Sequence, residues 1–276
     1  MGRYFLDNDQ IVDKASISID HPALLNGDGV FTTLIIKEGR IEFLDLHLER
    51  LKKHAAFLNI SFEKISKKLL SSFVIKTGAD RGIWKCKIVL IPDKPYLQSS
   101  KRSSRYLAFL EPIELKTGPL SLCVYPEEIS GPLSRIKTLS YIERHYLVGY
   151  AIDKGFDETL LCYKGFITEA AFANFFWIEK DTLFYPPKTL PYLFGITLSQ
   201  VIEAAKTIGL NVREKNISIG QLSPDCHCFL SNALMGFCSV IQIESTSFSR
   251  EKGLESSLKD AYDSLALQKA LLIGAK

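Results

Sequence analysis

Two charged residues stand in sequence surroundings that are unfavourable for a charge. Glu169 falls in the apolar, β-prone stretch from 165 to 187, where it is followed by several alanines. A carboxylate is costly to bury there unless a cation or a protonated group meets it. Lys137 directly precedes a helical pattern, where the helix dipole disfavours a cation. A helix N-terminus and a nearby arginine would lower the pKa of an amine or a Schiff-base nitrogen at this position. The alternative is a surface lysine whose ammonium stays in water.

A third charged residue, Arg50, shares one side of a predicted amphipathic helix with His47. A guanidinium binds phosphate well in bidentate geometry, so Arg50 is a candidate anion ligand. The alternative is that both residues belong to a solvated polar face. A second anion-binding feature is Gly195, because a glycine before a helix leaves backbone N–H groups available.

Composition favours small-molecule chemistry. The 276 residues are 46% hydrophobic, and the net charge is only +3, which is too low for a dedicated nucleic-acid-binding domain. No apolar run is long enough for a membrane helix, and the N-terminus has no signal-peptide pattern, so we expect a cytoplasmic protein. Cys226, His227 and Cys228 lack a second Cys/His pair at a zinc-like spacing, so we expect no metal site.

The order of elements predicts a mixed α/β and α+β chain of two domains, divided into residues 1–116 and 117–276 by a segment rich in Pro and Gly. In the first half we expect a hairpin within 4–19, helices over 44–59 and 62–77, and strands over 83–92 and 104–113. In the second half we expect strands over 120–125 and 212–217, two strands within 165–187, and a strand pair within 229–243. We also expect helices over 138–153, 197–208 and 251–273. The first of these helices should carry Leu139, Ile142, Tyr146 and Tyr150 on one side, and the last should carry Leu272 in its apolar stripe.

Several short motifs in this order resemble the fold-type IV pyridoxal-phosphate enzymes, a family that includes D-amino-acid and branched-chain aminotransferases and 4-amino-4-deoxychorismate lyase. The motifs are GDGVFTT (27–33), HLERL (47–51), Ile136 with Lys137, the region from Gly155 to Glu158, ITEAAFANFFW (167–177), YPP (185–187), FGIT (194–197) and SNALMG (231–236). The resemblance implies a two-domain fold with pyridoxal 5′-phosphate at the domain interface, and a homodimer.

The resemblance also implies a role for individual residues. Lys137 would hold the cofactor as a Schiff base, Glu169 would pair with its pyridine nitrogen, and Arg50 would bind its phosphate. Thr33 would offer a hydroxyl to the substrate, and Tyr141 would contact the cofactor or the substrate unless it belongs to the core. The remaining phosphate ligands would be Ile196, Thr197, Asn232 and Ala233. Arg135 would bind a substrate carboxylate or face solvent, and we favour solvent.

Motif details favour one reaction within the family. Thr32 and Thr33 stand where branched-chain aminotransferases commonly carry Glu, and the pattern around Asn232 also resembles the lyases. We therefore expect a lyase that makes 4-aminobenzoate and pyruvate from 4-amino-4-deoxychorismate. Tyr141 and Leu198 depart from the lyase pattern. They keep open a D-amino-acid or branched-chain aminotransferase acting on a small amino substrate. A third alternative is a non-catalytic phosphate-ligand or interaction protein that keeps the fold.

Overall fold

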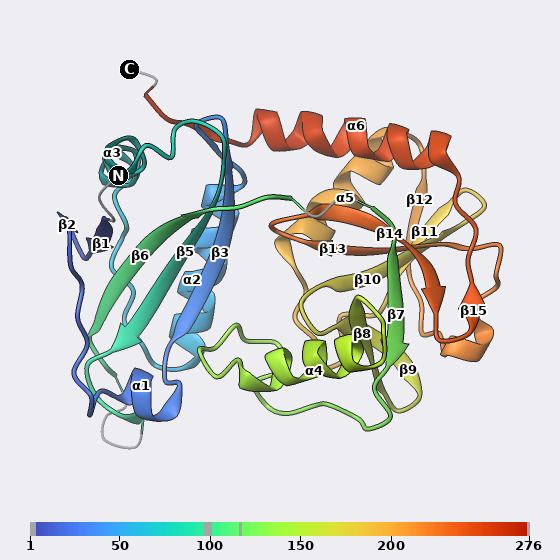
Figure 1. The fold of residues 1–276 in the computed structure, drawn as a ribbon, viewed down its shortest axis with the longest axis horizontal. Coiled ribbons are helices and arrows are strands. Elements are labelled where there is room, and N and C mark those ends of the chain that lie inside the picture. Colours follow the sequence, from blue (N-terminus) through green and yellow to red (C-terminus); the bar gives the residue numbers. More distant parts are fainter. Residues whose placement is uncertain (1–3, 97–100, 116–117, 275–276) are drawn as a thin grey trace. The chain divides into compact units, whose positions relative to one another are not determined.

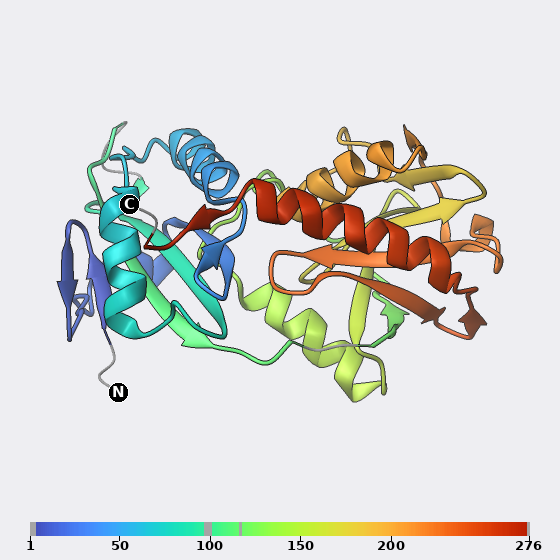
Figure 2. The same ribbon diagram turned by 90° about the horizontal axis from the view of Figure 1, so that it is seen from above.

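A computed structural model describes residues 4–96, 101–115 and 118–274, which fall into two compact units. The first unit contains the chain up to Glu114, the segment Ile136–Tyr141 and the residues from Ala266 onward. The second contains Leu115–Arg135 and Ile142–Leu265. The predicted division between residues 116 and 117 lies outside the described residues and stays a prediction. Figures 1 and 2 show the elements of each unit.

The first unit is built on an antiparallel sheet. Within the described residues it has seven strands in the order β16-β4-β3-β5-β6-β1-β2. Helix α2 packs along β3, and α3 packs beside β1 (Figures 1 and 2). The bounds are β1 Phe5–Asp7, β2 Gln10–Val12, α1 Pro22–Asn26, β3 Val30–Lys37, β4 Arg40–Ile41, α2 Leu44–Phe57, α3 Lys67–Thr77, β5 Ile83–Pro92, β6 Ser104–Pro112 and β16 Leu271–Leu272.

Most elements predicted for this unit are confirmed, with one shifted boundary. The helix expected over 62–77 begins only at Lys67, because the Ser66 hydroxyl accepts a hydrogen bond from the Leu69 N–H at 3.3 Å and caps the helix there. The hairpin expected within 4–19 is the short pair β1 and β2. The helix expected over 44–59 is α2, which buries Leu44, Leu51 and Ala55 against the sheet core, as the apolar spacing predicts.

The second unit contains a larger sheet. In the described residues it has nine strands in the order β12-β11-β10-β13-β14-β7-β8-β9, with β15 paired to β14. A further pairing between β9 and β10 closes the path from β10 to β9 into a ring. The bounds are β7 Leu120–Val124, α4 Ile142–Asp153, β8 Glu158–Tyr163, β9 Phe166–Ala170, β10 Asn174–Glu179, β11 Thr182–Tyr185, α5 Ile196–Thr207, β12 Asn211–Glu214, the 3-10 turn Ile219–Gln221, β13 His227–Asn232, β14 Gly236–Ile243, β15 Thr246–Ser247 and α6 Lys252–Gln268.

Two strand predictions and the predicted C-terminal helix need correction. The stretch from 165 to 187 contains three strands, β9, β10 and β11, where we expected two. The strand expected over 212–217 is β12, which ends at Glu214. The C-terminal helix ends at Gln268, and Leu272 lies in strand β16, which pairs with β4 of the first unit's sheet. Leu272 is therefore no part of a helical stripe.

The prediction of a helix over 138–153 is wrong at its start. Helix α4 begins at Ile142, and it buries Leu147 and Ala151. Of the four side chains expected on one side of the helix, Ile142 is 80% and Tyr146 59% exposed. The physical reason is that the residues before Ile142 belong to the first unit, where they pair with β3, so they cannot form the first turn of the helix.

This pairing explains two glycines of the GDGVFTT motif. The Phe31 N–H donates to the Lys137 carbonyl at 3.0 Å, and the Leu139 N–H donates to the Gly29 carbonyl at 3.0 Å. A Cβ on Gly29, at φ 143°, would lie 2.7 Å from both a Leu139 methyl and the Leu90 carbonyl oxygen. A Cβ on Gly27 would lie 2.4 Å from the Ser140 hydroxyl. Both glycines let the segment Ile136–Tyr141 approach β3 closely.

We predict that Gly29→Ala destabilises the protein by at least about 2 kcal/mol, because it adds both a backbone strain and a clash with the segment Ile136–Tyr141. Urea unfolding followed by circular dichroism measures this. Gly131→Ala is the matched control, since nothing lies within 4 Å of a Cβ there. Equal midpoints for the two variants would contradict the close-approach explanation.

Candidate active site

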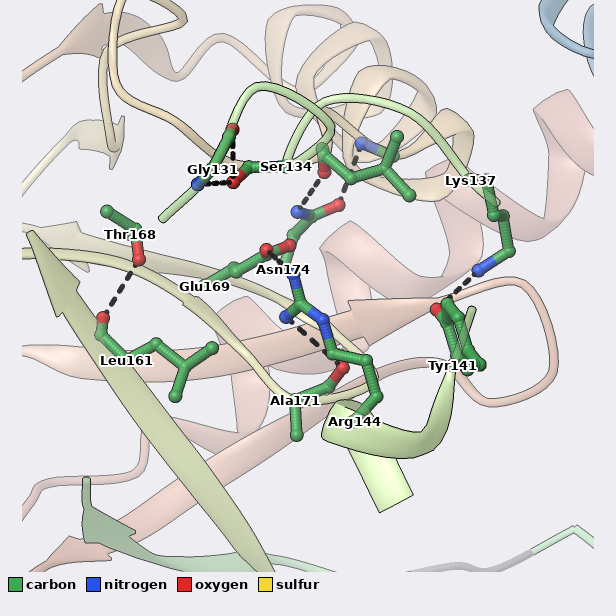
Figure 3. Close-up of polar contacts among 12 residues, drawn as sticks. Gly131, Ser134, Lys137, Tyr141, Arg144, Leu161, Thr168, Glu169, Ala171 and Asn174 are labelled. Atoms are coloured by element: carbon green, nitrogen blue, oxygen red, sulfur yellow. Dashed lines mark hydrogen bonds and ion pairs between the residues drawn. The ribbon is translucent and has the colours of Figure 1, made fainter. Parts of the chain in front are cut away.

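Lys137 lies in the first unit, held by its backbone on both sides. Its carbonyl accepts from Phe31 on β3, and its N–H donates to His54 Nδ1 on α2 at 3.1 Å. The side chain then reaches Tyr141, where Nζ donates to the hydroxyl at 2.8 Å (Figure 3). Nζ also lies 4.6 Å from the centre of the Phe31 ring and 4.8 Å from that of Tyr141. The amine is therefore fixed beside a hydroxyl and two aromatic rings.

This placement corrects the sequence argument for Lys137. The residue stands five positions before the first residue of α4, so the positive end of that helix dipole does not act on it directly. Arg50 and Lys137 both act on the same buried histidines, and the expected effect of Arg50 on the Lys137 amine stays a prediction. Tyr141 likewise precedes the helix, and its hydroxyl accepts the hydrogen bond from Lys137.

Arg50 extends from α2 into the interior of the first unit. One guanidinium nitrogen donates to the Thr32 hydroxyl at 3.1 Å, while Nε is shielded from solvent and has no hydrogen-bond partner among the described residues. Burial lowers the pKa of Arg50 to about 10, and the nearby Tyr141 opposes this shift. The alternative of a solvated polar face is therefore wrong. A half-buried guanidinium whose shielded Nε–H is unused among the described residues is suited to an anion such as phosphate.

Two histidines beside Arg50 are neutral. His47 contacts the Thr32 hydroxyl through Nδ1 at 2.7 Å and is 2% exposed. Burial lowers its pKa well below the usual value, and the charges of Arg50 and Lys137 add to the effect. The same causes lower the pKa of His54 to about 4. The histidines thus support Arg50 and Lys137 sterically and by hydrogen bonds, without adding charge near neutral pH.

Glu169 lies on β9 in the second unit and is only 6% exposed. Its Oε1 accepts from the Arg144 guanidinium at 2.6 Å, and Arg144 also donates to the Ala171 carbonyl at 3.4 Å (Figure 3). Sequence reasoning predicted that this carboxylate needs a cation, but it did not find Arg144. The available signal was the YIER sequence, in which Arg144 is the third residue of α4.

Asn174, the register partner of Glu169 on the neighbouring strand β10, holds the start of α5 with its side chain. Its Oδ1 accepts from the Gly195 N–H at 2.8 Å, and its Nδ2 donates to the Leu193 carbonyl at 2.7 Å. A Cβ on Gly195 would lie 2.2 Å from Oδ1. The motif FGIT therefore contains glycine because the side chain of Asn174 occupies the space of a Cβ.

The N-terminus of α5 is suited to an anion. Its first residues, Ile196 and Thr197, are buried, the N-cap residue Gly195 has no side chain to cap the helix, and the first turn has no acidic residue. The first backbone N–H groups of such a helix carry a partial positive charge. Each unit therefore contains a feature suited to bind an anion: the half-buried guanidinium of Arg50 in the first unit and the N-terminus of α5 in the second.

Other predicted site residues are placed less directly. Asn232 ends β13, and its Oδ1 accepts from the N–H groups of Leu234 and Met235 at 3.0 Å each, which closes the turn that contains Ala233. The Asn232 oxygen therefore shapes the turn. Thr33 is half-buried on β3, on the opposite side of the strand from Thr32. Arg135 is exposed and donates to the Thr189 and Leu190 carbonyls, in agreement with our preference for solvent.

The nine predicted residues thus fall into two groups. Arg50, Lys137, Tyr141 and Thr33 belong to the first unit, and Glu169, Ile196, Thr197, Asn232 and Ala233 belong to the second. Sequence reasoning missed the polar residues that hold these groups in place, which are Thr32, His54, Arg144 and Asn174. No set of three His, Cys, Asp or Glu in the described ranges could hold a metal ion. Nor does any described helix have the length and apolarity needed to cross a membrane.

Comparison with known proteins places the chain in a family. Residues 29–243 match the model of the amino-transferase class IV family, and the chain belongs to that family. Among curated relatives, it is 25% identical to the aminodeoxychorismate lyase of Bacillus subtilis (strain 168), over 93% of this chain and 89% of the relative.

Solved structures share the fold. The branched-chain amino acid aminotransferase from Escherichia coli superposes with a TM-score of 0.88 at 18% identity, covering 100% of both chains. A hypothetical aminotransferase from Mycobacterium tuberculosis, in its PLP-bound form, superposes with a TM-score of 0.83 at 17% identity, over 96% of this chain and 99% of that one. The predicted fold class, a two-domain fold-type IV architecture of mixed α and β elements, is confirmed.

The neutral state of His54 generates a prediction about pH. Well above pH 6.5 the residue is uncharged in both folded and unfolded chains. Below that pH the unfolded chain binds the proton first, because the folded pKa is about 4. His54 should therefore remove about 2 kcal/mol of stability at pH 5 and about 3 kcal/mol near pH 4.

The variant His54→Asn tests this, since Asn keeps an acceptor for the Lys137 N–H but does not titrate. Urea unfolding at pH 7.5 and pH 5 should show a smaller loss of stability in the variant than in the wild type. Parallel pH profiles would mean that His54 is not held neutral in the folded protein.

Proposed function

We propose that this chain is an enzyme that binds pyridoxal 5′-phosphate through the two groups of residues described above. The unpartnered Nε of Arg50 and the uncapped N-terminus of α5 both suit a phosphate. Lys137 would form the covalent bond, and Glu169 would accept a hydrogen bond from the ring nitrogen. When bound, the cofactor supplies an aldehyde that condenses with amines and a ring that accepts an electron pair.

The observation that carries this proposal is the environment of the Lys137 amine. Two backbone hydrogen bonds fix its main chain, and the Tyr141 hydroxyl at 2.8 Å fixes its side chain. A surface lysine whose ammonium is hydrated would not require these hydrogen bonds to its main chain and its side chain. The amine is therefore oriented for proton transfer, first as a base that removes a proton from the substrate carbon bearing nitrogen, then as an acid that returns it.

We further propose that the reaction is the conversion of 4-amino-4-deoxychorismate to 4-aminobenzoate and pyruvate. Similarity to the Bacillus subtilis lyase over nearly the whole of both chains supports this reaction. The threonine pair after Phe31 supports it as well. Thr32 is committed to His47 and Arg50, which leaves Thr33, on the other side of the strand, as the residue that offers a hydroxyl to the substrate.

Transamination of a branched-chain amino acid is the second candidate. It is consistent with the fold shared with the Escherichia coli branched-chain enzyme over the whole of both chains. The two reactions share the removal of the first proton by Lys137, and they differ in where the proton is returned. The described contacts of Lys137 serve either outcome, so a product assay has to separate them.

Purified enzyme given 4-amino-4-deoxychorismate should release 4-aminobenzoate and pyruvate in equal amounts, measured by chromatography. A branched-chain amino acid with 2-oxoglutarate should give at most a slow formation of the branched keto acid. Rapid keto-acid formation without any 4-aminobenzoate from the chorismate amine would overturn the lyase proposal in favour of transamination.

A second experiment tests the site directly. Borohydride reduction of the enzyme loaded with pyridoxal phosphate, followed by peptide mapping, should place the cofactor on Lys137. Lys137→Ala should bind no reducible cofactor, and Lys154→Ala, which changes an exposed lysine of the second unit, should be labelled like the wild type. A label on any other lysine would show that Lys137 has been assigned the wrong role.

A further inference from the structure

Glu169 already has a cationic partner within its own unit. Arg144 donates to Glu169 Oε1 at 2.6 Å, and the two side chains are only 14% and 8% exposed. The surroundings are apolar, because Ala170, Ala171 and Leu161 are all buried. A charge-assisted hydrogen bond in such a place is screened less than a surface ion pair, and it fixes the orientation of the Glu169 carboxylate.

A second carboxyl group lies within the electrostatic reach of Arg144. Glu158, at the start of β8, is half-buried, and burial raises its pKa to about 7, against the opposing effect of backbone N–H groups and of Arg144. Near neutral pH, a large fraction of Glu158 is therefore protonated and competes little for the guanidinium. Arg144 therefore interacts mainly with the carboxylate of Glu169.

The pair has a consequence for any group that donates a hydrogen bond to Glu169. A carboxylate accepts several hydrogen bonds at once, so Arg144 does not exclude another donor. When a proton can lie either on the donor or on the carboxylate, a cation in contact with the carboxylate favours the ionised carboxylate and keeps the proton on the donor. Loss of that cation moves the proton toward the carboxylate.

We propose that Arg144 is a positioning residue that holds Glu169 ionised and oriented, so that the proton shared with the cofactor's ring nitrogen stays on the nitrogen. This inference rests on the proposed pairing of Glu169 with pyridoxal phosphate. Helix α4, which carries Arg144, would thus influence how well the cofactor ring accepts electrons. Arg144 would act through Glu169, without contacting the cofactor itself.

The test uses enzyme loaded with pyridoxal phosphate that carries ¹⁵N in the ring, and its readout is the ¹⁵N chemical shift. Wild-type enzyme should show a protonated ring nitrogen. Arg144→Gln keeps a hydrogen-bond donor but removes the charge, so the signal should move more than half of the way toward the unprotonated reference. Arg144→Lys keeps the charge and should restore most of the wild-type shift.

A matched control and an affinity measurement accompany the spectra. Glu158→Gln removes another carboxyl group near Arg144 and should leave the ¹⁵N shift unchanged. Arg144→Gln should also weaken cofactor binding on the order of tenfold, measured by spectral titration, because Glu169 no longer offers a fixed charge. Arg144→Lys should recover most of that affinity.

The outcomes separate this inference from the proposed function. If Lys137 is labelled and Glu169→Gln shifts the ¹⁵N signal, but Arg144→Gln does not, then Arg144 is only a structural partner and the inference is wrong. If Glu169→Gln also leaves the ring nitrogen unchanged, the proposed pairing of Glu169 with the cofactor fails as well. If Arg144→Gln does not fold, the ¹⁵N shift of Arg144→Lys provides the test. A shift in Arg144→Lys equal to that in Glu169→Gln would show that a positive charge at position 144 does not keep the proton on the ring nitrogen, and the inference would be wrong.

Discussion

The site in the first unit depends on one short backbone pairing, that of the segment Ile136–Tyr141 with strand β3. Two hydrogen bonds of 3.0 Å, one on each side of Val30 and Thr138, make this segment part of the first unit, although the chain on both sides of it belongs to the second. Gly29 permits the approach, and His54 accepts the N–H of Lys137. The position of the lysine is thus decided by the contacts of its main chain with β3 and His54.

Buried charge is compensated differently in the two units. Arg50 has only neutral hydrogen-bond partners around it, and an N–H of its guanidinium remains unused among the described residues. Glu169 has a full ionic partner in Arg144. An unused cationic donor is suited to bind an anion that arrives later, whereas a carboxylate already held by a cation is suited to remain ionised while it accepts a further hydrogen bond.

The neutral histidines show how the protein limits this charge. His47 and His54 lie three residues before and four residues after Arg50 on α2, and both are buried. Burial and the neighbouring cations keep them uncharged, so they provide hydrogen-bond acceptors and shape near two positive groups. A protonated histidine at either position would repel both Arg50 and Lys137.

The sequence by itself determined the family, the mixed fold and most element boundaries, because motifs, helical spacing and strand composition are local properties of the chain. It also showed that Glu169 needs a cation, since the cost of burying a charge follows from residue type alone. The tertiary structure decided that the cation within reach is Arg144. It also decided that residues 136–141 pair with β3 and do not form the first turn of the helix that follows them. Both depend on contacts between residues that the sequence keeps far apart, 25 positions for Arg144 and Glu169 and more than 100 for Phe31 and Lys137, and no local pattern encodes such contacts.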